Sequence, residues 1–147
     1  MADEAQRLLY YIVEHYTGRE EVKDVERSAT TAEAVQEIEA EQRRVMRKER
    51  ALADRMVRPF LRGLAKAYAA YCAGGNAITL DDRNAEENMM AEALIHFLVG
   101  PGLASSMSRE TEPMHYLYII SIHWDKLAEL ARKAQVDLEA MLKLAMR

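Results

Sequence analysis

The most constraining feature of this 147-residue chain is a long stretch of helix-forming residues from Thr30 to Cys72. The stretch contains one proline, Pro59, and one glycine, Gly63. As a single helix it would be about 60 Å long, at roughly 1.5 Å of rise per residue. That is as long as a compact domain of this chain length is wide, or longer, so such a helix either crosses the domain or projects from it.

Turn-forming residues are scarce, because the whole chain has only 6 glycines and 3 prolines. This scarcity favours few, long elements over the many turns of a β-sandwich. We therefore predict an all-α fold of five or six helices in one helical domain, residues 1–147. The predicted parts are an N-terminal helix and connector (1–27), a long helix (31–72) kinked near Pro59, and a C-terminal helical bundle (79–147).

Local signals set the expected helix boundaries. Thr17 with Glu20, Thr30 with Glu33, and Thr79 with Asp82 have the spacing of helix-capping pairs, and predict helices over 19–27, from 31, and from 79 to about 99. Gly100–Glu112 is polar and is predicted as a loop. Pro113 suits the first turn of the next helix, whose apolar run Tyr116–Ile122 is expected at the centre of the bundle. A last short helix follows Asp137.

The two halves of the long helix differ in character. Beyond Met56 a wide apolar stripe predicts burial, so residues 57–147 and the first helix are expected to form the body. Before it, the apolar positions form only a thin seam at roughly heptad spacing: Val35, Ile38, Val45, Leu52 and Met56. A helix this polar cannot lie in a core, so we expect it to project into solvent or to pack on a second copy through that seam.

Basic residues are concentrated in the same helix. Nine lysines and arginines against two acids lie between Arg43 and Lys66, while the whole chain has a net charge of −4. On a helical projection one side carries Arg44, Arg47, Lys48, Arg55, Arg58, Arg62 and Lys66. Such a row attracts polyanions, including nucleic acid, through counterion release. The alternative is a solvated face, or one paired with acids of this chain or of a second copy.

Two resemblances concern the C-terminus. The spacing from Leu130 to Val136 is similar to that of a helix-turn-helix, although the second helix would present Asp137 and Glu139 to DNA, where acids are unfavourable. A packed helical corner is the alternative.

Residues 135–142 resemble the tail of all-α nucleotide pyrophosphohydrolases of the MazG type, which hold Mg²⁺ on acidic side chains. The acids that this resemblance implicates are Glu86, Glu87, Glu92 and Asp125, but the E-x-x-E spacing of that family is absent.

Other possible sites have weaker signals. Glu92 and His96 are four residues apart, and Glu112 with His115 has E-x-x-H spacing, which di-iron bundles use twice. A single such pair is more typical of a satisfied histidine than of a metal ligand, and no partner is evident for His115 or His123. Cys72 is the only cysteine and is expected to be an inert, buried thiol. No cofactor motif is present.

The remaining expectations concern location and function. No signal peptide or membrane-length apolar run is evident, so we predict a cytoplasmic protein with no membrane contact. We predict a non-catalytic helical assembly or adaptor protein. It would form homo-oligomers through the seam and present the basic face to an acidic protein or to nucleic acid. The alternative is a Mg²⁺-dependent nucleotide hydrolase.

Overall fold

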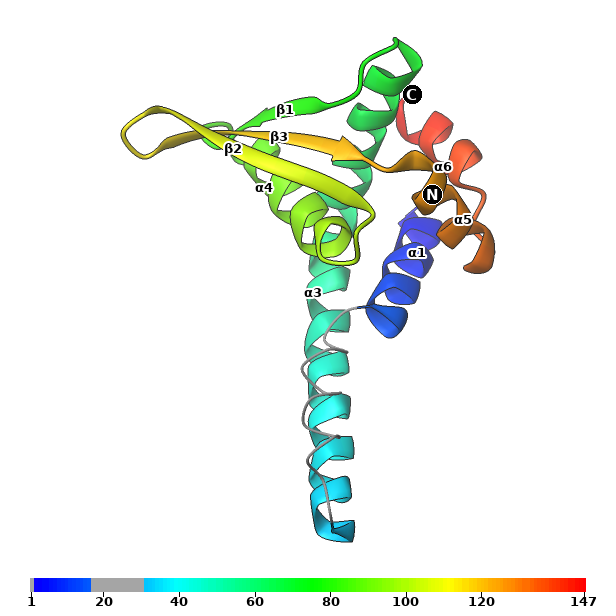
Figure 1. Cartoon of the computed structure of the whole chain (residues 1–147). Helices are drawn as coiled ribbons and strands as arrows, with labels where there is room; N and C mark the ends of the chain where they lie inside the picture. Colours follow the sequence, from blue (N-terminus) through cyan, green and yellow to red (C-terminus); the bar gives the residue numbers. More distant parts are fainter. Residues whose placement is uncertain (1, 17–30) are drawn as a thin grey trace.

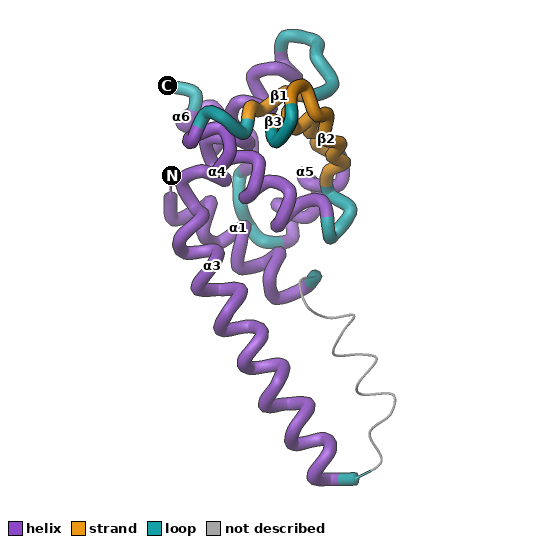
Figure 2. Tube along the Cα trace, turned by 90° about the vertical axis from the view of Figure 1, so that its left-hand side faces the viewer, coloured by secondary structure: helices purple, strands orange, loops and turns teal. Residues whose placement is uncertain are grey.

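The computed structural model describes residues 2–16 and 31–147. Its elements in chain order are α1 (Ala2–His15), α3 (Ala32–Cys72), β1 (Ile78–Asp81), α4 (Ala85–Leu94), the π-helix η1 (Ile95–Val99), β2 (Ala104–Glu112), β3 (His115–Ile122), α5 (Trp124–Lys133) and α6 (Leu138–Ala145). The sheet and the helices form one body, from which the N-terminal half of α3 projects (Figure 1, Figure 2). The helix predicted over 19–27 lies outside the described residues.

The all-α prediction is wrong, because the body contains a three-stranded antiparallel sheet with strand order β1-β3-β2. Apart from Ile78, all three strands lie in the region predicted as a C-terminal helical bundle, residues 79–147. The apolar run Tyr116–Ile122, predicted as helical, belongs to β3. Its tyrosines and isoleucines favour a pleated surface, but periodicity alone cannot separate a short apolar strand from a buried helix.

The other two strands give weaker sequence signals. β2 occupies the segment predicted as a loop, and all of its residues after Ala104 are exposed. It therefore lacks the alternation of apolar and polar residues by which a half-buried strand is recognised. β1 has four residues and includes Thr79, the residue predicted to cap a helix. The actual cap of α4 is Asn84, whose side-chain oxygen accepts a hydrogen bond from the Glu87 amide at 3.1 Å.

α3 is one helix from Ala32 to Cys72 and continues through Pro59. Its N-cap is Thr31, one residue later than predicted, where the hydroxyl accepts from the Ala34 amide at 3.1 Å. Cys72, at the other end, is exposed, so the prediction of a buried thiol is wrong.

One hydrophobic core joins every described element of the body. It contains Leu8, Leu9 and Ile12 of α1, Phe60 and Leu64 of α3, Leu94 and Phe97 of α4 and η1, Leu80 and Ile120 of the sheet, Leu127 of α5 and Met141 of α6. The rings of Phe60 and Phe97 meet edge to face, with centroids 6.2 Å apart. Burial of these side chains fixes the C-terminal half of α3 within the body.

The C-terminal helices form a corner around small buried residues. Ala131, Ala134 and Val136 are buried, and Gln135 makes the turn with a φ of 60°. Asp137 caps α6 by accepting from the Ala140 amide at 3.1 Å. These contacts fit the packed-corner interpretation of the helix-turn-helix spacing.

Candidate interaction surface on the projecting helix

The point where α3 leaves the body is marked by contacts with α1 and η1. Asp54 accepts hydrogen bonds from the Tyr10 hydroxyl and from Gln6 Nε2, the latter at 2.8 Å. One turn earlier, Arg50 forms an ion pair with Glu14 near the end of α1. On the η1 side, Glu49 lies 2.8 Å from His96 Nε2. Below this level α3 extends past the end of α1, as Figure 1 shows.

The hydrogen bonds at Asp54 shift the pKa values of both partners. The Tyr10 hydroxyl, followed by Gln6, lowers the pKa of the Asp54 carboxyl below its ordinary value. The same hydrogen bond is the largest cause of the raised pKa of Tyr10. Asp54 is therefore an ionised carboxylate that fastens α1 to α3 at neutral pH.

Three of the seven predicted basic residues are engaged in ion pairs. Arg44 binds Glu41 of the preceding turn at 2.6 Å. In the body, Arg62 pairs with Glu86 at 3.1 Å. Lys66 pairs with Glu87 at 3.5 Å. Charges neutralised by carboxylates of the same chain attract an external anion less strongly.

The other four residues of the row form no ion pair with any residue in 2–16 or 31–147. They are Arg47, Lys48, Arg55 and Arg58, and all four are exposed. Lys48 is close enough to Glu41 to contribute to the lowering of that carboxyl's pKa, after the larger effect of Arg44. From Arg47 to Arg58 the row is about 16 Å long, at roughly 1.5 Å per residue. We call these four residues the free basic row.

The free basic row borders an open groove between α1 and α3. The groove has a volume of about 380 Å³ and is lined by Asp3, Gln6, Asp54, Arg55, Val57 and Arg58. The row therefore begins on the projecting half of the helix and reaches the body at this groove.

The predicted oligomer seam is divided between the body and the projecting half. Leu52 and Met56 are half-buried and pack against the core of their own chain. Ile38 is 6% exposed, whereas Val35 is 46% exposed. Val45 is half-buried. The apolar positions with open surface are therefore Val35 and, in part, Val45.

The acids of the alternative hydrolase site do not come together. Glu86 and Glu87 are held in separate ion pairs with Arg62 and Lys66. Glu92 accepts from Asn88 at 3.4 Å. Asp125 lies on α5, beside a different depression. Within the described ranges, the one group with metal-ligand spacing is Asp81, Asp82 and His115, and it contains none of these acids.

That group was not predicted from the sequence, because His115 lies on β3 whereas Asp81 and Asp82 lie at the end of β1 and in the turn that follows. Because β1 was not predicted, Asp82 was interpreted only as the partner of Thr79 in a helix-capping pair. The E-x-x-H spacing drew attention to His115 but paired it with Glu112, whereas its carboxylate partners come from the end of β1. His96 likewise pairs with Glu49 of α3 and not with Glu92. Contacts of this kind require the sheet register and the helix packing, which local spacing does not contain.

None of the described helices combines the length and the apolar character that would be needed to cross a lipid bilayer. Comparison of the chain with protein-family models, with curated proteins and with solved structures finds no match.

Proposed function

We propose that this protein is a non-catalytic assembly or adaptor protein that presents the free basic row of α3 to an anionic partner. The observation that carries the proposal is the contrast along one helix. Arg62 and Lys66 are neutralised by carboxylates in the body, whereas Arg47, Lys48, Arg55 and Arg58 are exposed without an ion pair to the described residues. Cations left unpaired on an extended helix are available to an external polyanion.

Elementary electrostatics supports this use of the row. Four cations in a line about 16 Å long, at roughly 1.5 Å per residue, match the repeated charges of a polyanion better than a single anionic group. The local charge opposes the net charge of −4 of the whole chain, so attraction would be confined to this face. Binding of this type is electrostatic, so it should weaken steeply as salt is added.

Charge-neutralising variants test the proposal. The fourfold variant Arg47→Gln, Lys48→Gln, Arg55→Gln, Arg58→Gln removes the free basic row. The control variant Arg44→Gln, Arg62→Gln, Lys66→Gln removes three cations that already have carboxylate partners. Both are titrated with labelled duplex DNA, single-stranded DNA and polyglutamate at low salt, and binding is followed by fluorescence anisotropy.

We expect the wild-type protein and the control variant to bind at least one of these polyanions, and the fourfold variant to bind at least tenfold more weakly. Preference for DNA identifies a nucleic-acid partner, and preference for polyglutamate identifies an acidic protein. Equal loss of binding in the two variants would contradict the special role of the free row. So would the absence of wild-type binding to all three probes.

Self-association through the projecting half belongs to the same proposal. Val35 is exposed and Val45 is half-buried, on the part of α3 that extends beyond α1. Light scattering coupled to size exclusion should give a mass above that of one 16.8 kDa chain, and Val35→Asp should reduce it. A strict monomer at tens of micromolar would remove oligomerisation from the proposal and leave the basic row to be judged by the titrations.

A further inference from the structure

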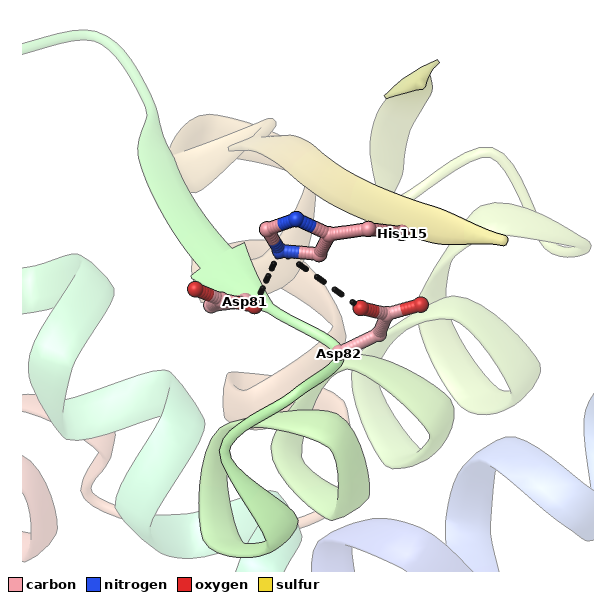
Figure 3. A group of neighbouring side chains, drawn as sticks. All are labelled: Asp81, Asp82 and His115. Carbon is pink, nitrogen blue, oxygen red and sulfur yellow. Dashed lines mark hydrogen bonds and ion pairs between the residues drawn. The ribbon is translucent and has the colours of Figure 1, made fainter. Parts of the chain in front are cut away.

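A second cluster of charged side chains lies in the body, away from the free basic row. It is formed where β1 ends beside the start of β3, and it comprises Asp81, Asp82 and His115. Figure 3 shows the imidazole from β3 directed at both carboxylates, Asp81 at the end of β1 and Asp82 in the turn that follows. His115 Nε2 lies 2.8 Å from Asp81 Oδ1 and 3.8 Å from Asp82 Oδ1.

Hydrogen bonds from neighbouring elements fix this arrangement. Asp81 and Leu117 are partners in the β1–β3 register, which places His115 two residues away, alongside the turn. The Asp82 amide donates to the Tyr116 carbonyl at 3.2 Å, and Asp81 Oδ1 accepts from the Arg83 amide at 2.9 Å. The amide of Arg83 is the largest cause of the lowered pKa of the Asp81 carboxyl, and His115 is the next. These contacts hold the Asp81 carboxyl beside the ring of His115.

The other ring nitrogen of His115 also has a partner. Its Nδ1 lies 2.8 Å from Thr111 Oγ1. The β2–β3 register shifts between Glu110 and Glu112, so Thr111 is the extra residue of a bulge, and this shift brings its hydroxyl to the ring. Without an ion, Nε2 is within hydrogen-bond distance of Asp81. An ion bound at Nε2 would replace any proton there and would require the tautomer in which Nδ1–H donates to Thr111. Histidines that bind metals usually have an outer partner of this kind, which fixes the ring and its tautomer.

One atom of the cluster is unsatisfied. Asp82 Oδ1 is buried and has no hydrogen-bond partner. Its side chain is 18% exposed overall, and the His115 side chain 13%. A buried carboxylate oxygen that accepts no hydrogen bond is energetically unfavourable. The cation on the same turn, Arg83, is engaged with Glu112 at 2.6 Å.

Charge and geometry together indicate what would satisfy this oxygen. The cluster offers two carboxylate groups and one imidazole nitrogen, a donor set that suits a divalent cation. The three ligand atoms lie within 4.8 Å of one another. Atoms bound to one Zn²⁺ at about 2.0–2.1 Å are roughly 3.3 Å apart in tetrahedral geometry. The observed separations of 2.8 and 3.8 Å from the imidazole nitrogen lie on either side of that value, and the two carboxylate oxygens lie within 4.8 Å of each other.

We propose that Asp81, Asp82 and His115 form a binding site for a divalent transition-metal ion, with Zn²⁺ the preferred species. A set of one imidazole nitrogen and two carboxylate oxygens suits Zn²⁺ or Mn²⁺ better than Mg²⁺ or Ca²⁺, which prefer oxygen ligands alone. Three protein ligands leave a coordination position for water. The bound ion would join the β1–α4 turn to the β2–β3 hairpin.

The test is calorimetric titration of chelator-treated protein with ZnCl₂ at neutral pH, together with thermal unfolding. We expect one Zn²⁺ per chain in the wild type and a rise in melting temperature on addition of the ion. His115→Gln and Asp82→Asn should each weaken binding by at least tenfold. Thr111→Val, which removes only the outer partner of the ring, should weaken it by about tenfold. His96→Gln is the matched control and should bind as the wild type does.

Folding of each variant is checked by its melting temperature without metal. Asp82→Asn keeps the shape and removes an unsatisfied charge, so without metal it should melt no lower than the wild type. Wild-type protein that binds no Zn²⁺ would overturn the proposal and leave a plain histidine–aspartate ion pair. Zn²⁺ binding that survives both His115→Gln and Asp82→Asn would also overturn it, because the ion would then lie elsewhere. Mg²⁺ binding as tight as Zn²⁺ binding would contradict the assigned role of the imidazole.

Discussion

At the scale of single residues, the contact between α3 and α4 depends on Gly63. A Cβ at this position would lie 3.0 Å from Leu94 Cδ1 and 3.1 Å from Met90 Cβ. Met90 Cβ is attached directly to the backbone, so it cannot move away as the end of a long side chain can. Glycine therefore allows the two helices to approach, at the expense of about 1 kcal/mol of helix propensity relative to alanine.

We predict that Gly63→Ala lowers the free energy of unfolding by about 1 to 2 kcal/mol, because overpacking outweighs the gain in propensity. Urea denaturation followed by circular dichroism measures the change. Gly100→Ala is the control: its φ of −54° suits any residue, and no atom lies within 4 Å of the added Cβ. It should be neutral or slightly stabilising. A more stable Gly63→Ala variant would show that the helices can separate.

The contact between α1 and α3 should give the protein's stability a measurable acid dependence. Asp54 has a folded-state pKa below its ordinary value, because Tyr10 and Gln6 donate hydrogen bonds to it. Its stabilising contribution is therefore present above the unfolded-state pKa, near 4, and is lost as the pH falls through the lower folded-state value.

We predict that Asp54→Asn lowers the melting temperature at pH 7 and reduces the further drop between pH 5 and about pH 3, relative to the wild type. Asparagine keeps an oxygen acceptor for Tyr10 but loses the charge. Glu37→Gln, an exposed change on the projecting half of α3, should leave the acid dependence as it is. The same acid dependence in the wild type and in Asp54→Asn would show that the carboxylate does not hold α1 in place.

At the scale of elements, sequence patterns predicted the long helix, because it requires only local propensity. The expected range agrees closely with the bounds of α3, Ala32–Cys72. The amino-acid pattern also predicted that its N-terminal half is polar and its C-terminal half apolar. The sheet could not be predicted in the same way. β2 is mostly polar and exposed after Ala104, and β1 is very short. The turn between β2 and β3 has Pro113 and Met114, whereas an Asn-Gly pair would have predicted a hairpin.

That turn leads to a prediction about the hairpin. Met114 has a φ of 67° and is 86% exposed, so its side chain contributes little packing while its backbone is in a region that favours glycine. Met114→Gly should raise the free energy of unfolding by up to about 1 kcal/mol. Met107→Gly, an exposed position in β2, should lower it, because glycine weakens a strand. Thermal denaturation measures the change in stability of each variant. If Met114→Gly is destabilised as Met107→Gly is, the backbone at Met114 is not strained.

At the scale of the whole molecule, the chain combines a packed body with a charged helix that extends from it. The sequence indicated the basic row, because helical periodicity alone places those residues on one side. It did not indicate which cations are neutralised, since Glu86 and Glu87 face Arg62 and Lys66 only once α4 packs on α3. The cluster at Asp81 could not be predicted from the sequence either, because its histidine comes from β3, more than thirty residues later in the chain.

The salt dependence of polyanion binding tests the central claim most directly. For duplex DNA, the logarithm of the association constant should fall linearly with the logarithm of salt concentration, with a slope of about −0.9 per phosphate contacted. The free basic row contains Arg47, Lys48, Arg55 and Arg58, so we predict a slope of about −3 to −4 for the wild type. The fourfold glutamine variant should have a slope near zero. A wild-type slope near zero, or equal slopes for the two proteins, would contradict the account.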